Sequence, residues 1–385
     1  MIYREMGKTG VKVSQLGFGC MRFPVLDGDN AKIDEVKATE MIEYAIAGGV
    51  NYFDTAFVYH TAGAGQGQSE FFTGKALKPY RDQVNIATKL PSWLINTPAD
   101  NMKYLDMQLK ALDTDTIDFY LLHALGRDSY DNLKKNDIFK FIDEAKRLGK
   151  IKHIGFSFHA PYDEFDYIIN DYDWEFSQIQ YNILDTDYQA GAKGLKQIAD
   201  KNAGVVIMEP LRGGTLTDMV KPARDLLAQQ SETRTMADWA LSWLFDQPSI
   251  STVLSGMSTL EQVKENIEIA SRVEANSLSP AEREALTQAA GIVKGSIKVP
   301  CTACQYCMPC PQGVNIPDNF SRYNSYFYYD EQSEARETIK FSYYNFFNEA
   351  EWAEQCISCG ICEEHCPQQI KISERMPEVA ELFKK

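Results

Sequence analysis

The chain has 385 residues, of which 44% are hydrophobic and 24% charged, and its formal net charge is −15 at pH 7. This composition is typical of a globular protein with room for one large domain and a smaller one. The acidic balance excludes non-specific nucleic-acid binding, because a phosphate backbone requires a basic counter-surface. The acidic charge is compatible with a cationic protein partner.

Compartment is inferred from hydropathy and from cysteine usage. No stretch reaches membrane-spanning length, and the amino-terminal segment has no apolar core of signal-peptide length. We therefore expect a cytoplasmic protein that does not enter membranes. Eight of the nine cysteines follow residue 300, and clustered thiols in a reducing compartment indicate metal ligands more often than disulfides.

Apolar periodicity predicts a hairpin at 2–14, with its turn at 7–10, followed by a long alternation of strands and helices. Strands are predicted at 16–20, 51–54, 84–89, 117–122, 151–156, 176–181, 204–208 and 250–254. Helices are predicted at 35–47, 68–78, 98–112, 131–148, 161–170, 189–202, 233–246 and 259–272.

Eight such alternations over about 270 residues match the size of a (β/α)₈ TIM barrel. The alternative is a doubly wound sheet, which usually carries G-x-G-x-x-G after its first strand. Residues 17–22 lack the third glycine and any helix start, so the barrel is favoured. Ser279 and Pro280 form a helix start after the alternation stops. We expect the barrel domain to cover 1–290 and a cysteine-rich domain to cover 291–385.

Polar side chains end three successive predicted strands, namely Asp54, Lys89 and His123, and Tyr59 follows on the loop after Asp54. Carboxyl ends of neighbouring parallel strands meet at one barrel mouth, where ligands bind. Any one of these residues alone is structural more often than catalytic. Together they suit carbonyl reduction, in which a hydride adds to carbon and an acid protonates the developing alkoxide.

The roles follow from ordinary acidities. A phenol has a pKa of about 10 and exchanges protons slowly at neutral pH unless a cation favours its phenolate. Lys89 would supply that cation, Asp54 would hold the ammonium, and His123 would orient the carbonyl oxygen.

Four segments resemble motifs of the aldo-keto reductase family, over roughly residues 1–275. They are Gly17-Phe18-Gly19-Cys20-Met21-Arg22, Phe53-Asp54-Thr55-Ala56, Ile86-Ala87-Thr88-Lys89 and Leu121-Leu122-His123. The resemblance implies a catalytic tetrad of Asp54, Tyr59, Lys89 and His123, with Tyr59 as general acid. It also implies a nicotinamide dinucleotide cofactor, NADH or NADPH, bound without a glycine-rich Rossmann loop.

By the same resemblance, Ser157 and Gln178 would hold the carboxamide, although the family's Asn after that serine is Phe158 here. Met208 would cover the nicotinamide ring where many members use a tyrosine. The pyrophosphate would lie beside the segment Leu211, Arg212 and Gly213. The alternative is that this segment is an ordinary turn after the seventh strand.

At the adenosine end the resemblance implies contacts from Gln262, Glu265 and Asn266. NADPH-preferring members bind the 2′-phosphate with a Lys and an Arg, and this chain has Gly256 and Gln262 instead. Because a dianion binds more weakly without cations, we expect NADH to be used at least as well as NADPH.

Two cysteine runs lie beyond the barrel. They are Cys301, Cys304, Cys307 and Cys310 before Pro311, and Cys356, Cys359, Cys362 and Cys366 before Pro367. In two-cluster ferredoxins the Cys before proline ligates the other cluster. This predicts one [4Fe–4S] cluster on Cys301, Cys304, Cys307 and Cys366, and a second on Cys356, Cys359, Cys362 and Cys310. Two Cys₄ zinc sites are the alternative.

The aromatic-rich stretch 317–352, with a helix-prone run from Glu331 to Ile339, is similar to α-helical ferredoxin modules fused to oxidoreductases. Cys20, apart from both runs, is predicted to be buried packing on the first strand.

Three hypotheses explain how the barrel and the cysteine-rich domain act together. The chain is a nicotinamide-dependent reductase of a small carbonyl, or oxidises the alcohol, and its module serves a redox partner or senses redox state. Alternatively it is an electron-transfer protein whose barrel is a carrier, or its clusters are purely structural. Specificity would come from mouth loops with Phe23, Trp93, Arg127 and residues 60–68.

Overall fold

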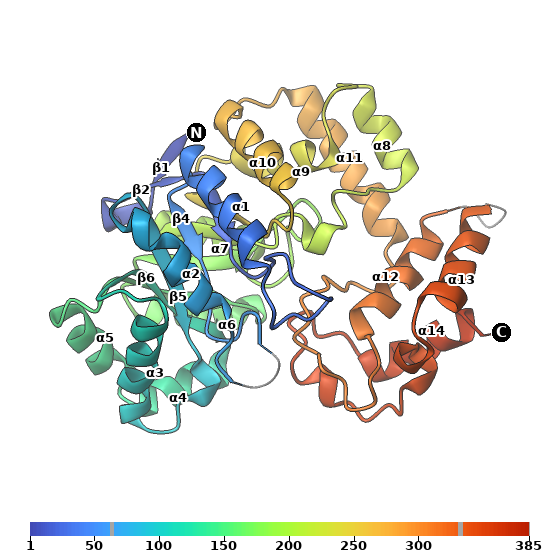
Figure 1. Ribbon diagram of the computed structural model, residues 1–385. Helices are drawn as coiled ribbons and strands as arrows, with labels where there is room; N and C mark the ends of the chain where they lie inside the picture. The colour runs from blue at the N-terminus through green and yellow to red at the C-terminus, as the bar shows by residue number, and fades with distance from the viewer. Residues whose placement is uncertain (62–64, 330–333, 385) are drawn as a thin grey trace. The chain divides into compact units, whose positions relative to one another are not determined.

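The computed structural model describes residues 1–61, 65–329 and 334–384. Eight parallel strands close into a barrel in the order β10-β3-β4-β5-β6-β7-β8-β9, and helices surround them (Figure 1). The strands are β3 (Leu16–Gly19), β4 (Tyr52–Asp54), β5 (Asn85–Leu90), β6 (Ile117–Leu125), β7 (Ile151–Phe158), β8 (Phe176–Gln180), β9 (Gly204–Met208) and β10 (Thr252–Ser255). The predicted TIM barrel and the location of its strands are confirmed.

The hairpin closes the amino-terminal end of the barrel. Its strands, β1 (Tyr3–Glu5) and β2 (Lys12–Ser14), pair antiparallel around a short 3₁₀ turn at Gly7–Thr9. Met6 and Val13 pack with residues inside the barrel. Gly7 has φ +51°, and a Cβ there would lie 2.3 Å from the backbone nitrogen of Gly204, so only glycine fits. The carboxyl end of the barrel is thereby left for the site.

The helices that follow the strands match their predicted positions closely. They are α1 (Glu35–Ala47), α2 (Ser69–Leu77), α3 (Pro98–Ala111), α4 (Arg127–Lys135), α5 (Ile138–Arg147), α6 (Tyr162–Asp171), α7 (Gly191–Asp200), α9 (Met236–Phe245) and α10 (Leu260–Arg272). One prediction was wrong, because the helix expected at 131–148 is two helices. Asp137 adopts φ +57° between them, which an α-helix does not accommodate.

The chain forms two compact units, residues 1–210 with 240–278, and residues 211–239 with 279–385. The second unit is helical, as predicted, with α8 (Lys221–Ala228), α11 (Pro280–Ser296), α12 (Ile316–Phe327), α13 (Glu334–Phe346) and α14 (Ile372–Leu382). Ser279 caps α11 through the Glu282 amide, confirming that helix start. The predicted domain boundary near residue 290 falls inside α11. The helix-prone run 331–339 is described from residue 334 onward, and 331–333 lie outside the described residues.

Buried aromatic side chains organise the core of the second unit. The Tyr343 and Phe383 rings stack at 4.2 Å, and the Tyr343 hydroxyl donates to Oδ1 of Asn319 at 2.7 Å. The same hydroxyl accepts from the amide of Ala353 at 3.0 Å. Much of the aromatic-rich stretch 317–352 therefore packs in the core of this unit.

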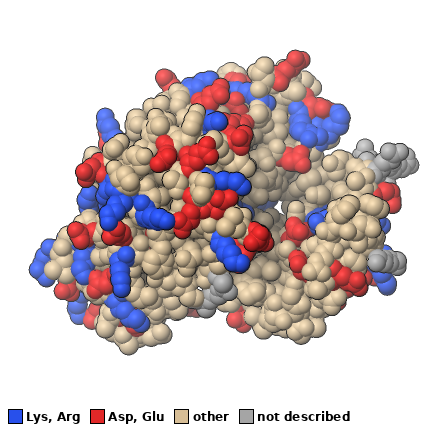
Figure 2. Space-filling view, viewed as in Figure 1, with Lys and Arg blue, Asp and Glu red and all other residues tan. Residues whose placement is uncertain are grey.

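The surface of the chain mixes both signs of charge. Acidic and basic side chains lie interspersed on the face drawn in Figure 2. No helix in the described part of the chain combines the length and the hydropathy of a membrane span.

Candidate active site and cysteine clusters

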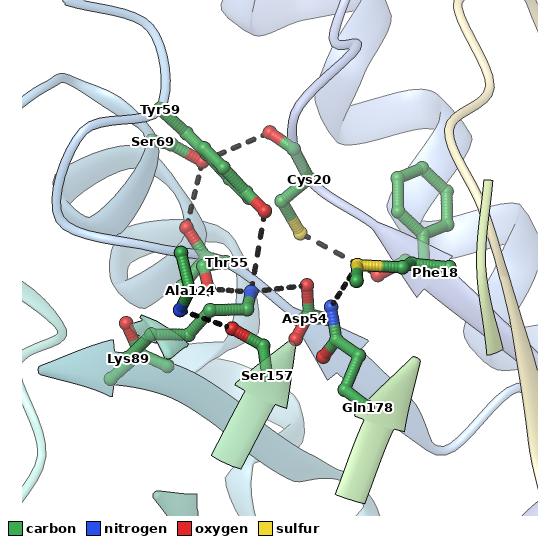
Figure 3. Close-up of polar contacts among 12 residues, drawn as sticks. Phe18, Cys20, Asp54, Thr55, Tyr59, Ser69, Lys89, Ala124, Ser157 and Gln178 are labelled. Atoms are coloured by element: carbon green, nitrogen blue, oxygen red, sulfur yellow. Dashed lines mark hydrogen bonds and ion pairs between the residues drawn. The ribbon is translucent and has the colours of Figure 1, made fainter. Parts of the chain in front are cut away.

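The predicted tetrad comes together at the carboxyl end of three neighbouring strands. Asp54 ends β4, Lys89 is the penultimate residue of β5, and His123 lies near the end of β6. The Lys89 ammonium donates to Oδ1 of Asp54 at 2.6 Å and to the Thr55 carbonyl oxygen at 2.8 Å. It also donates to the Tyr59 hydroxyl at 3.3 Å (Figure 3).

The Asp54–Lys89 pair is almost fully buried, with Lys89 at 0% and Asp54 at 2% exposure. Burial raises the pKa of the Asp54 carboxyl, and the Lys89 ammonium opposes that rise. A buried ammonium is stable only when it is paired and hydrogen-bonded. The site therefore holds a fixed positive charge directly beside a phenol.

The Tyr59 loop depends on a glycine. A Cβ at Gly67 would lie 1.9 Å from the carbonyl oxygen of Tyr59. The Gly67 amide donates to the carbonyl oxygen of Phe57 at 2.7 Å, which closes the loop. The Lys89 ammonium lies 4.9 Å from the Tyr59 ring centroid, so the ring is held over the cation.

His123 is an uncharged member of the site. Burial lowers its pKa well below the ordinary value, and the Lys89 ammonium and the His159 ring lower it further. Its ring lies 6.4 Å from that of Tyr59 and 5.2 Å from that of Trp93. A neutral imidazole here can orient a carbonyl oxygen but does not hold an anion.

A buried polar network supports Lys89 from behind. Oε1 of Glu70 accepts from the Thr88 hydroxyl at 2.6 Å and from Nε2 of Gln108 at 2.7 Å. The Gln108 amide also donates to the carbonyl oxygen of Lys89 at 2.9 Å. Glu70 is completely buried, and the sequence reasoning did not single it out.

Cys20 is buried, as predicted. Burial raises the pKa of its thiol to about 12, so it stays protonated at neutral pH. The Cys20 carbonyl oxygen accepts from the Ser69 hydroxyl at 3.0 Å (Figure 3).

Three residues predicted for the nicotinamide lie on adjacent strands, with Ser157 opposite Gln178 on β7 and β8. Nε2 of Gln178 donates to the Met208 sulfur at 3.5 Å, which brings these two together. Within the described residues, Oε1 of Gln178 is buried without a hydrogen-bond partner. This oxygen can accept a hydrogen bond from the NH₂ group of a carboxamide. Phe158 instead packs outward on Phe165, at 5.1 Å between ring centroids.

The residues predicted for the adenosine have structural contacts at the start of α10. Oε1 of Gln262 accepts from the amide of Ser258 at 2.8 Å, within a capping box with Thr259. Nδ2 of Asn266 donates to the Ser255 hydroxyl at 3.0 Å, and Glu265 is half-buried on the same helix.

Arg22 also reaches this segment, and the sequence reasoning had not assigned it there. A Cβ at Gly256 would lie 2.8 Å from Cγ of Arg22, so the arginine stem passes over the glycine. The two are distant in sequence, and only the pairing of β3 with β10 brings them together.

Leu211, Arg212 and Gly213, predicted to pass the pyrophosphate, belong to the second unit. A Cβ at Gly213 would lie 1.9 Å from the Thr302 carbonyl oxygen, and Thr302 follows Cys301. The Arg212 side chain is buried, and its charge acts on Tyr328. This loop therefore packs against the first cysteine run.

Of the predicted specificity residues, Phe23 is buried and packs edge-on against Phe72 at 5.0 Å. Arg127 lies over the Tyr167 ring at 4.3 Å. Trp93 is 48% exposed. Residues 62–64 of the predicted loop 60–68 lie outside the described residues.

The four cysteines of the first predicted set line one cavity, and the thiols of the second set interact electrostatically with one another. A cavity beside the first cysteine run is lined by apolar side chains and by Cys301, Cys304, Cys307 and Cys366. In the second set, burial raises the pKa of the Cys362 thiol to about 11. The other three thiols of this set raise it as well, and they are Cys356, Cys310 and Cys359. Four thiols around a cavity with an apolar wall, including Ile316, Phe320, Ile370 and Ile372, fit an iron–sulfur cluster.

Comparison with protein families agrees with both parts of the chain. Residues 15–284 match the Aldo/keto reductase family, and residues 300–370 match the 4Fe-4S dicluster domain. Among solved structures, the holo form of aldo-keto reductase AKR11C1 from Bacillus halodurans is 26% identical, with a TM-score of 0.61. That match covers 75% of this chain and 96% of the other.

Curated proteins give the same grouping. L-galactose dehydrogenase from Arabidopsis thaliana is 27% identical over 316 residues, covering 76% of this chain and 94% of its own length. The 6-dehydroglucose reductase of Novosphingobium aromaticivorans is 26% identical over 283 residues, covering 69% and 89%. The chain is an oxidoreductase with a carboxyl-terminal 4Fe-4S domain, and it belongs to the aldo/keto reductase family.

Proposed function

We propose that this protein reduces an aldehyde or ketone to an alcohol, or catalyses the reverse reaction, with Tyr59 as the general acid. The observation that carries the proposal is the buried Lys89 ammonium, held by Asp54 at 2.6 Å and donating to the Tyr59 hydroxyl at 3.3 Å. The cation favours the phenolate, so the phenol is a better proton donor beside Lys89 than in water. The proton would pass to the developing alkoxide.

The neighbouring residues would orient the substrate. His123 is neutral and lies beside Tyr59, so it can donate a hydrogen bond to the carbonyl oxygen without holding a permanent anion. A bound nicotinamide would supply the hydride. Ser157, Gln178 and Met208 would hold the nicotinamide, and the unpartnered Oε1 of Gln178 suits its carboxamide.

We further propose that NADH is used at least as well as NADPH. Gly256 and Gln262 carry no charge for a 2′-phosphate, and Gln262 is occupied in the α10 cap. Glu265 and Asn266 would contact the adenine. The side chain of Arg22 passes over Gly256, so this segment still carries one cation. Its effect on binding of the 2′-phosphate is measured separately.

The carboxyl-terminal cysteines would hold two [4Fe–4S] clusters in the crossed sets described above. No flavin motif in the sequence would split a hydride into single electrons, so direct flow from nicotinamide to cluster is chemically awkward. We therefore propose that the clusters serve a redox protein partner or sense redox state. A purely structural role is the alternative, favoured by the close packing of the Gly213 loop on Thr302 beside Cys301.

The substrate class is proposed as a small carbonyl compound or its alcohol. The similar curated proteins named above are a dehydrogenase of L-galactose and a reductase of 6-dehydroglucose. Anaerobically purified protein should be tested with NADH and NADPH on a panel of aldehydes, ketones and sugars. Reduction of at least one carbonyl is expected. If the intact cluster-loaded protein reduces none but exchanges electrons with a ferredoxin-type partner, the barrel is a carrier.

The role of the clusters needs a separate test. Clusters reduced with dithionite should be reoxidised when cofactor and carbonyl substrate are added, if they are redox-coupled to the site. An unchanged anaerobic spectrum would leave the structural role standing.

A further inference from the structure

A second imidazole, His159, lies at the mouth of the barrel directly after β7. Side chains alternate along a strand, and here Ser157 faces the site while Phe158 packs outward on Phe165. His159 follows at the carboxyl end of that strand, the same end of the barrel as Lys89 and His123. The charge of Lys89 acts on His159, and His159 acts in turn on His123, so His159 lies within electrostatic range of the site.

His159 offers an unused hydrogen-bonding atom. Its Nδ1 is buried and has no hydrogen-bond partner within the described part of the chain. Gln189, from the loop after β8, hydrogen-bonds the ring and fixes it. Leaving a buried polar atom without a partner is unfavourable, so a ligand group that satisfies it is favoured.

The ring is uncharged at neutral pH. Burial lowers the pKa of His159 to about 4, and the Lys89 charge acts in the same direction. A neutral imidazole offers an anionic group a hydrogen bond but no opposite charge, so this residue does not favour a carboxylate or phosphate over a hydroxyl. A hydroxyl both donates and accepts, so it satisfies Nδ1 in either tautomer of the ring.

The surroundings favour the substrate side of the site over the cofactor. The unpartnered Oε1 of Gln178 already matches the carboxamide. His159 neighbours His123, whose ring lies 5.2 Å from that of the half-exposed Trp93. An aromatic wall beside a few polar groups is the usual construction of a small-molecule pocket.

We infer that His159 is a specificity residue that binds a hydroxyl group adjacent to the reacting carbonyl, so that α-hydroxy carbonyl compounds are the preferred substrates. This rests on the proposed function, because it places the carbonyl at Tyr59 and His123.

The first test compares substrates that differ by one hydroxyl, hydroxyacetone against acetone and glyceraldehyde against propanal. In the wild type we expect kcat/KM to favour the hydroxylated member by about tenfold or more. His159→Phe should bring that ratio to within about threefold of one. His159→Gln, which keeps a donor and an acceptor, should retain most of the preference. A ratio that is unchanged in His159→Phe would overturn the inference.

The second test does not need turnover. The chain has five histidines, so imidazole NMR signals can be assigned by their loss in His159→Gln. We expect 1,2-propanediol to shift the His159 signal and 2-propanol to leave it in place. If no carbonyl is reduced but the diol shifts that signal, the proposed function fails and the hydroxyl site stands. If carbonyls are reduced but neither ratio nor signal responds to the hydroxyl, the hydroxyl site fails alone.

Discussion

Nζ of Lys89 lies 2.6 Å from Oδ1 of Asp54, and both side chains are buried from solvent. Removing one member of such a pair leaves an uncompensated charge inside the protein, whereas removing both does not. The pair therefore makes a stability prediction that is separate from any prediction about catalysis.

Lys89→Met should lower the free energy of unfolding of the barrel by about 3–5 kcal/mol. The double variant Asp54→Asn with Lys89→Met should recover most of that loss. Urea unfolding followed by tryptophan fluorescence measures both, and Lys103→Met, an exposed lysine, is the control. Equal losses in the single and double variants would show that the charge pair is not the cause.

A second prediction concerns the crossed cluster ligands. Cys366→Ser should remove the cluster of the first run, and Cys310→Ser that of the second, because in the proposed assignment each cluster takes one ligand from the other run. Iron content should fall from about eight to about four atoms per chain in either variant. Cys20→Ser, which changes a buried thiol of the barrel, should keep its iron. Full iron content in both ligand variants would contradict the assignment, and tightly bound zinc in place of iron would favour the zinc alternative.

A third prediction concerns the cofactor. On one aldehyde, kcat/KM with NADH should equal or exceed that with NADPH. Arg22→Gln should lower kcat/KM for NADPH by about tenfold and that for NADH by no more than about threefold, because only NADPH carries the 2′-phosphate. A hundredfold wild-type preference for NADPH would contradict the prediction for NADH. An unchanged NADPH value in Arg22→Gln would remove the arginine from the site.

The fourth prediction concerns how the free energy of unfolding depends on pH through Glu175, a residue away from the site. Burial alone would raise the pKa of Glu175, but hydrogen bonds from His153 and Lys146 and from the Ile154 amide bring it to about 2. Because the folded pKa lies below the unfolded one, this stabilisation is present above about pH 4.5 and is lost as pH falls towards 2.

The free energy of unfolding should fall by about 3 kcal/mol across that window from this group alone. Glu175→Gln should destabilise the barrel at pH 7 and flatten the slope. Urea unfolding at several pH values measures it. A variant with the wild-type slope would show that Glu175 does not carry the effect.

One physical reason explains why the sequence predicts the strands and three of the four tetrad positions. Buried parallel strands are short apolar runs, so a charged or polar residue at the end of such a run is visible without any structure. Asp54, Lys89 and His123 are of this kind, and the closed strand order then places them together. Tyr59 could be added from its place on the loop after β4.

Other features depend on contacts between segments that are distant in sequence. Arg22 reaches Gly256 only because β3 pairs with β10. The buried, unpartnered Nδ1 of His159 and the packing of Phe158 on Phe165 depend on the folded chain, and the motif around Ser157 does not show them. The break at Asp137 is a single left-handed residue within an otherwise periodic stretch, and periodicity does not detect it.

The most direct measurement is the turnover of Tyr59→Phe, which removes the phenolic hydroxyl and keeps the ring over Lys89. With anaerobically purified protein and one carbonyl substrate of the wild type, we expect kcat/KM to fall by at least about 100-fold. Cluster absorbance and iron content should be unchanged, because the variant lies outside the cysteine sets. A variant that keeps wild-type activity with its clusters intact would contradict the assignment of Tyr59 as the proton donor.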